Sequence, residues 1–171
     1  LLRTILRLQS PTKGRISFFR QGEPVSSLDM GYLPQKNSID SRFPITVEEV
    51  VASGLMGNTQ KGNTKFDSKK EIDEMLDLMG ITALRNKPIG VLSGGQLQRS
   101  LFGRALISKP EMLILDEPAS YIDRQLGNRM FEILRDLSSN GTTIMMVSHE
   151  IEPFITLSNR NLYINHILGD R

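Results

Sequence analysis

Leu-Ser-Gly-Gly-Gln-Leu-Gln-Arg occupies residues 92–99. Ser93 is a residue type that caps helices, and Gln96, three positions later, is placed to bond back to the N–H group of the cap. The paired glycines Gly94 and Gly95 let backbone N–H groups approach an anion without intervening side chains, at the helix end that favours negative charge. The stretch therefore predicts a helix that begins at Ser93 and faces a phosphate group.

Farther along, an apolar run over 112–115 lies between Pro110 and Pro118. Such a run is typical of a strand that is buried on both faces of a parallel sheet. Asp116 and Glu117 follow it, at the strand end where open α/β sheets bind ligands. One carboxylate could hold Mg²⁺ through water while the other orients or deprotonates a water molecule aimed at a γ-phosphate. Taken alone, an acidic pair at a strand end is more often structural.

After this strand the chain alternates helix and strand. Asp123 can cap a helix whose apolar positions recur every three or four residues, and 143–147 is a second apolar run that predicts another buried strand. Residues 163–167 suit an edge strand. Because strand, helix and strand follow one another, the pattern predicts a parallel sheet in an α/β fold.

Earlier residues predict shorter elements. Apolar positions suit an amphipathic helix over 1–8, short strands over 15–19 and 30–33, and a turn over 21–24.

Two further capping boxes predict helices before residue 92. Thr46 with Glu49 precedes one apolar helical pattern, and Ser68 with Glu71 precedes another that stops at Gly80. Between them, residues 54–66 are rich in Gly, Asn, Lys and Thr and predict a surface loop.

We therefore expect a single domain over 1–171. Residues 1–36 and 111–171 contribute to the sheet, and about 37–110 form an inserted helical subdomain.

Composition narrows the classes of function. The chain has 171 residues, a net charge of +2 and no cysteine, which excludes disulfides, thiolate metal sites and thiol catalysis. The basic residues are scattered, so we expect no nucleic-acid partner. No apolar run is long enough to cross a bilayer and no signal pattern opens the chain, so we expect a cytoplasmic protein.

Two other polar residues could belong to the phosphate site. His149 ends the apolar run next in sequence after Glu117 and could sense a terminal phosphate, although a single histidine is more often structural. Gln35 follows Pro34, where a lone glutamine is usually a loop residue, but its amide could complete a metal or water shell.

Five segments, in order and in spacing, together resemble the ATP-binding cassette (ABC) ATPases of transporters. They are Gly-Tyr-Leu-Pro-Gln at 31–35, the signature-like run at 92–99, Leu-Ile-Leu-Asp-Glu-Pro at 113–118, Ser-x-x-Asp at 120–123 and Ser-His at 148–149. The resemblance covers nearly the whole chain. It implies the P-loop NTPase (RecA-like) fold, a parallel sheet with an inserted helical subdomain.

The resemblance also implies roles for nine residues that would meet ATP or Mg²⁺. They are Ser93, Gly94, Gly95 and Gln96 of the signature motif, the Walker B carboxylate Asp116 near Mg²⁺, the catalytic base Glu117, Asp123 of the D-loop, the switch histidine His149, and Gln35 of the Q-loop, which also approaches Mg²⁺.

Members of this family work in assemblies. The resemblance implies ATP and Mg²⁺ as cofactors, and a homodimer in which each signature motif closes over the ATP of the other subunit. It also implies a membrane permease that binds the cassette at the inner face of the membrane, and a solute-binding protein that acts indirectly. Residues 43–54 resemble the subgroup that serves zinc and manganese importers, although the alternative that they only shape a generic cassette stays open.

One family motif is absent from the 171 residues, the Gly-x-x-Gly-x-Gly-Lys-Ser/Thr loop whose amides and lysine grip phosphates. Residues 1–6 and 11–14 resemble the segment that comes directly after this loop in the family. We therefore expect an N-terminally truncated cassette that is inactive alone, from an intact parent ATPase that drives solute import.

Two alternatives stay open. The chain could be a non-catalytic module that docks on a partner cassette or permease. It could also come from a soluble ABC ATPase that works on DNA or ribosomes, although the small net charge does not favour this.

Overall fold

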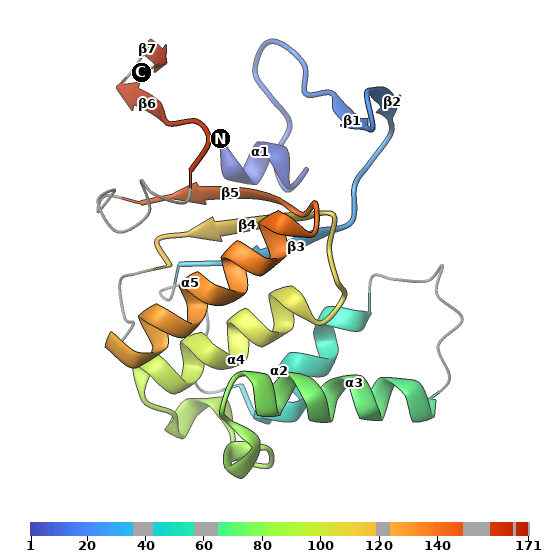
Figure 1. The fold of residues 1–171 in the computed structure, drawn as a ribbon, viewed down its shortest axis with the longest axis vertical. Helices are drawn as coiled ribbons and strands as arrows, with labels where there is room; N and C mark the ends of the chain where they lie inside the picture. Colours follow the sequence, from blue (N-terminus) through green and yellow to red (C-terminus); the bar gives the residue numbers. More distant parts are fainter. Residues whose placement is uncertain (36–42, 57–64, 119–123, 149–157, 166, 171) are drawn as a thin grey trace.

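The computed structural model describes residues 1–35, 43–56, 65–118, 124–148, 158–165 and 167–170 (Figure 1). Its helices, including 3₁₀ turns marked η, are α1 (Leu2–Ile5), α2 (Val47–Ala52), η2 (Ser53–Leu55), α3 (Lys65–Leu78), η3 (Thr82–Leu84), η4 (Ile89–Val91), α4 (Gly94–Leu106) and α5 (Arg124–Ser139). Its strands are β1 (Phe18–Arg20), β2 (Glu23–Val25), β3 (Met30–Leu33), β4 (Met112–Asp116), β5 (Thr143–Val147), β6 (Leu162–Asn165) and β7 (Ile167–Asp170).

A parallel sheet lies at the centre, in the order β3-β4-β5. Leu33 pairs with Leu115, and Leu115 pairs with Met146, so the three strands end at one common edge. Figure 1 shows α1 on one side of this sheet and α4 and α5 on the other. The predicted parallel α/β sheet is confirmed.

Strand β4 is buried on both faces, as its unbroken apolar sequence predicts. Leu113 and Leu115 are fully buried in a large core that the helices α2 to α5 complete, whereas Met112 and Ile114 join a smaller core with Leu2 of α1. Alternate residues of one strand therefore serve two cores, which fixes its register because a slip by one residue would exchange the faces.

Helices fill the connection between β3 and β4, as predicted. Glycines let α4 approach two neighbours: a Cβ at Gly31 would lie 2.1 Å from Ala105 O, and one at Gly54 would lie 2.1 Å from Arg104 O. Helix α4 therefore packs backbone to backbone against β3 and against η2.

The capping box predicted at Thr46 and Glu49 is confirmed, with both reciprocal bonds present at the start of α2. The one predicted at Ser68 and Glu71 is wrong, because α3 begins at Lys65 and Ser68 lies inside the first turns of the helix. The predicted loop over 54–66 is accordingly too long at both ends, since η2 covers its first residues and α3 its last.

The prediction that 143–147 is a buried strand is correct for the strand and wrong for the burial. Thr143 and Val147 are exposed, and the three residues between them are only partly buried. Strand β5 is the edge of the described sheet, so among the described strands only β4 pairs with it.

Two antiparallel hairpins complete the described chain. In the first, β1 and β2 are joined at Gln21 and Gly22, which both have positive φ (52° and 86°), as a tight type I′ turn requires. The second pairs β6 with β7, so the single edge strand predicted over 163–167 is wrong in extent: β6 ends at Asn165 and Ile167 already belongs to β7.

Candidate functional site

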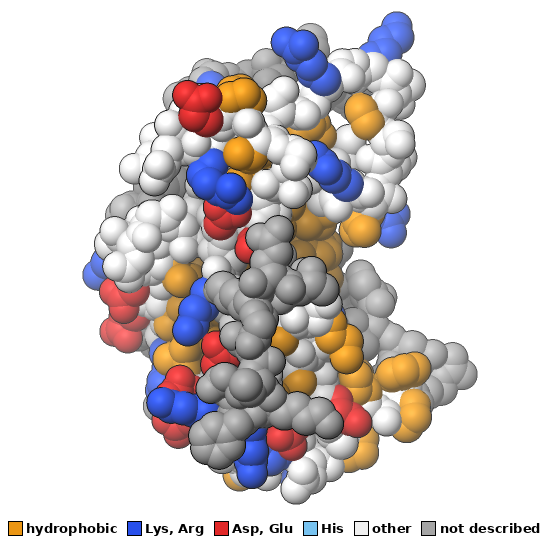
Figure 2. Space-filling view, turned by 90° about the vertical axis from the view of Figure 1, so that its right-hand side faces the viewer, with side chains coloured by type: hydrophobic (Ala, Val, Ile, Leu, Met, Phe, Trp, Pro, Cys, Tyr) orange, Lys and Arg blue, Asp and Glu red, His pale blue; other side chains and the backbone are white. Residues whose placement is uncertain are grey.

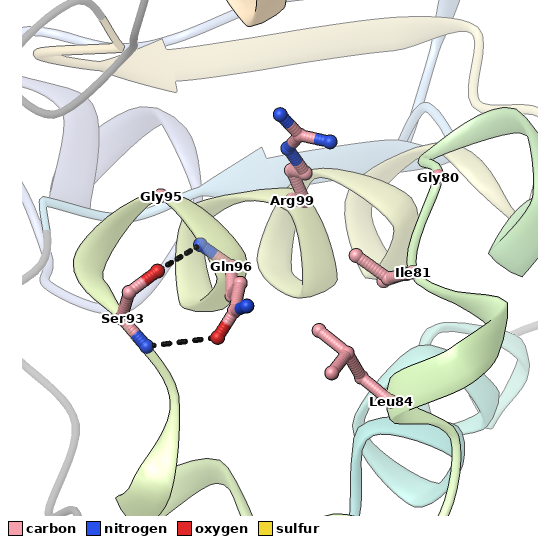
Figure 3. A pocket seen from close by; sticks show the side chains of 7 residues that line it. All are labelled: Gly80, Ile81, Leu84, Ser93, Gly95, Gln96 and Arg99. Atoms are coloured by element: carbon pink, nitrogen blue, oxygen red, sulfur yellow. Dashed lines mark hydrogen bonds between the residues drawn. The ribbon is translucent and has the colours of Figure 1, made fainter.

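The first turn of α4 has the predicted capping box. Ser93 Oγ accepts from the Gln96 N–H over 3.3 Å, and Gln96 Oε1 accepts from the Ser93 N–H over 3.0 Å (Figure 3). Within the helix, the N–H groups of Gly94 and Gly95 have no carbonyl to bind. This turn therefore presents two donors and the positive end of a 13-residue helix beside an exposed serine.

A hollow of about 230 Å³ opens beside this turn. Its walls come from two parts of the chain. One is α4 and its cap, and the other is the segment from the end of α3 through η3. The lining residues are Ser93, Gly95, Gln96 and Arg99 from the first, and Gly80, Ile81 and Leu84 from the second (Figure 3). Gly80 has a φ of +64°, and a Cβ there would lie 3.4 Å from Arg99 Nη1. The positive φ favours glycine at the end of α3, whereas the 3.4 Å distance is an ordinary contact that a side chain could make with Arg99.

The acidic pair lies at the carboxyl end of β4, where the sequence places it. Asp116 is half-buried and accepts a hydrogen bond from Tyr32 Oη of β3 over 3.4 Å. Burial first, and then the neighbouring Asp116 charge, raise the pKa of the Tyr32 phenol, which keeps it protonated as a donor.

Glu117 has an unusual backbone. Its φ is +52°, a region that residues other than glycine seldom occupy, and the residue is only 9% exposed. The Glu117 N–H donates to Val147 O at the end of β5 over 2.8 Å, so the neighbouring strand holds this conformation in place. Such backbone strain recurs at functional sites, and here it coincides with the predicted catalytic carboxylate.

Of the three remaining predicted site residues, the structure describes only Gln35. Gln35 lies two residues beyond β3 and is exposed. Asp123 and His149 lie outside the described residues. In Figure 1 the first turn of α4 and the carboxyl ends of the sheet strands lie toward the same side of the molecule, but the hollow beside α4 does not include Asp116 or Glu117.

The donor set at the sheet edge fits Mg²⁺. Among the described residues no three His, Cys, Asp or Glu side chains gather at a potential metal site. Magnesium, however, is usually bound through one or two carboxylates together with substrate phosphates, and it prefers oxygen donors. The Asp116 carboxylate and the Gln35 amide oxygen are donors of this kind.

Two features of the site were not predicted from the sequence. One is the hydrogen bond from Tyr32 to Asp116. The other is the lining role of Arg99. Strand alternation alone could not have indicated the first, because Tyr32 and Asp116 come to share one face only through the register of β3 on β4.

Comparisons with known proteins agree with this arrangement. A family model described as "ABC transporter" matches residues 1–120. A probable metal transport system ATP-binding protein of Chlamydia pneumoniae is 38% identical over 96% of this chain and 68% of its own length. The zinc uptake system ATP-binding protein ZurA of Listeria monocytogenes is 37% identical over 99% of this chain and 65% of its own length. The chain thus spans about two thirds of these relatives.

The fold is also that of a solved cassette. The dimeric structure of a post-hydrolysis state of an ATP-binding cassette, bound to ADP and Pi, superposes with a TM-score of 0.79 over 99% of this chain and 78% of that one, at 22% identity. The predicted cassette fold, a P-loop NTPase sheet with helices packed on it, is confirmed. In the described part of this chain, no helix has the length and apolar character that would let it cross a membrane.

Proposed function

The chain belongs to the ABC transporter ATPases, and from this premise we propose that it is part of the ATP-hydrolysing subunit of a metal-ion importer. The observation that carries the proposal is the end of β4, where Asp116 and a strained, buried Glu117 lie together at the sheet edge. The capped first turn of α4 supports it, because its open N–H groups suit a phosphate.

Some of the site residues would contact the phosphates of ATP, and others would hold the Mg²⁺ ion. Ser93, Gly94, Gly95 and Gln96 would contact the phosphates of an ATP held by a second copy of the chain. Asp116 and Gln35 would hold Mg²⁺, which, when bound, neutralises charge on the phosphates. Asp123 and His149 would approach the same ATP.

Glu117 would act as the base. Its carboxylate can accept a proton from the water that attacks the γ-phosphate, and its buried position keeps competing water away. The bond from its N–H to Val147 O holds the backbone, so the carboxylate would be oriented before the nucleotide arrives.

The transported solute is proposed from the relatives. Their names include metal transport, zinc uptake and zinc import systems. We propose zinc or a related divalent ion. In such a system the solute would be selected by a solute-binding protein and a permease, while this subunit would act at the inner face of the membrane as a homodimer.

Charge on the surface supports a protein partner more than a nucleic acid. Figure 2 shows Lys and Arg interspersed with Asp and Glu over one face. A binding surface for nucleic acid would instead gather basic residues.

We expect the 171-residue chain, purified as it stands, to hydrolyse little or no ATP, because its sequence contains no phosphate-gripping glycine loop with lysine. Phosphate release at the rate of the complete gene product would contradict this expectation.

Uptake tests the proposal. Cells that carry the complete operon should accumulate zinc or manganese, and cells in which this gene encodes Glu117→Gln should not. Normal uptake with the Gln variant would instead favour the second candidate, a non-catalytic module that docks on a partner cassette.

A further inference from the structure

We propose that Tyr32 is a positioning residue, which holds the Asp116 carboxylate in one orientation by a hydrogen bond. The phenol Oη donates to Asp116 Oδ2 over 3.4 Å. The inference rests on the proposed function, because it gives Tyr32 a role only where Asp116 serves a bound nucleotide.

The sheet itself places the two side chains together. Tyr32 of β3 is the register partner of Ile114 of β4, and Asp116 lies two residues farther along β4. Side chains two residues apart on a strand share a face, so Asp116 lies on the face that Tyr32 and Ile114 share, and the Tyr32 hydroxyl reaches it. The contact therefore depends on strand register and not on a loop.

Tyr32 is held on both sides of the sheet. Its ring packs against the smaller core, which includes Leu2 and Ile5 of α1. From the opposite face, Arg104 Nη2 of α4 donates to the Tyr32 carbonyl oxygen over 3.4 Å. A half-buried ring with an anchored backbone has few rotamers available, so its hydroxyl occupies a fixed point.

The hydrogen bond from Tyr32 also fixes the direction of Oδ1, the other oxygen of the Asp116 carboxylate. The rotation of an aspartate carboxylate about its last torsion is broad when nothing fixes it. With Oδ2 held by the phenol, Oδ1 keeps one direction, which favours binding of a metal–nucleotide complex by preorganisation. A purely structural tyrosine would instead use Asp116 only to satisfy its hydroxyl.

Titration with Mg²⁺ separates these roles. In the complete gene product, Tyr32→Phe keeps the ring and removes the hydroxyl. We expect the Mg²⁺ concentration that half-saturates ATP binding to rise about tenfold, because residues that orient metal ligands have effects of this size. At saturating Mg²⁺, the ATP affinity should change by less than about twofold.

Ile114→Val is the matched control, because it trims the register partner of Tyr32 on the same face and leaves the hydroxyl in place. It should leave the Mg²⁺ dependence unchanged. If Tyr32→Phe and wild type need the same Mg²⁺ concentration, the inference is overturned.

A second readout needs neither metal nor nucleotide. In EDTA, the effects of Tyr32→Phe and Asp116→Ala on denaturant unfolding should be non-additive, as expected of residues in contact. If the effects of the two substitutions on the free energy of unfolding were additive, the proposed contact between Tyr32 and Asp116 would be overturned, whether or not the protein binds ATP. A wild-type protein that bound no ATP at any Mg²⁺ concentration would overturn the proposed function instead, and the role of Tyr32 with it.

Discussion

The first turn of α4 and the end of β4 carry the two parts of the candidate site, and they are built differently. The turn is determined locally, because the side chains of Ser93 and Gln96 each accept a hydrogen bond from the other residue's backbone N–H group. Ser93 is also exposed. The end of β4 is determined by tertiary structure, since its flanking strands and a bond to Val147 O place Glu117.

The difference teaches what each part can do. A locally determined, exposed turn can be offered to a second molecule without loss of the fold. A buried strand end depends on the core, so it is suited to hold a reacting group still. Substitutions at the two places should therefore have different effects. We expect the larger loss of ATP hydrolysis at the strand end and only a small loss of stability at the turn.

The largest effect is expected at the strand end. Glu117→Gln keeps the shape of the side chain and removes the base, so ATP hydrolysis by the complete gene product should fall about a hundredfold or more. ATP binding, measured by a fluorescent nucleotide, should persist. Unchanged hydrolysis would show that Glu117 is not the base.

Stability should respond most strongly inside β4. Leu115 is fully buried, so Leu115→Ala should lower the free energy of unfolding by about 2–5 kcal/mol. Met146→Ala, at its register partner in the edge strand β5, should cost clearly less. Equal losses in urea unfolding would mean that β5 is as buried as its sequence predicts.

The capped turn should show a small loss of stability together with a loss of function. Ser93→Ala removes the Oγ that accepts from the Gln96 N–H and should cost about 1 kcal/mol. Thr46→Ala breaks the equivalent box of α2 and is the matched control, with a similar cost. ATP hydrolysis should fall only for Ser93→Ala. An equal fall in both variants would show that the α4 turn acts only as a helix cap and has no role at the nucleotide.

The smallest effect concerns the opposite end of β4. The Arg20 guanidinium, and then the Asp29 N–H, lower the pKa of Glu111 below its usual 4.5. A lowered folded-state pKa contributes stability above pH 4.5 that is lost as the pH falls through the folded value. Glu111→Gln should make the loss of stability below pH 4.5 shallower in acid unfolding, and a steeper loss would contradict this assignment.

Patterns of neighbouring residues predicted all of the α4 turn, but of the strand end they predicted only the strand and its two carboxylates. Capping chemistry and the apolar run of β4 depend on adjacent residues, so both could be read from the sequence. The incorrectly predicted box at Ser68 and Glu71 follows the same general capping-box pattern, but there the helix begins upstream at Lys65 and the serine is internal.

The features that the sequence could not predict depend on neighbours distant in the chain. Strands β4 and β5 have similar apolar runs, and only the sheet order makes one central and the other an edge. The bond from Tyr32 to Asp116 and the positive φ of Glu117 likewise arise from strand register and from pairing with β5. No pattern within a single segment contains this information.

The central claim is that the α4 turn of one subunit serves the β4 carboxylates of another, and mixed dimers test it most directly. Complete gene products carrying Ser93→Arg and Glu117→Gln should each be inactive, but equal mixtures should regain about a quarter of wild-type ATPase activity. Half of the dimers then contain one intact composite site out of two. A mixture that stays inactive, although mixed dimers form, would contradict the claim.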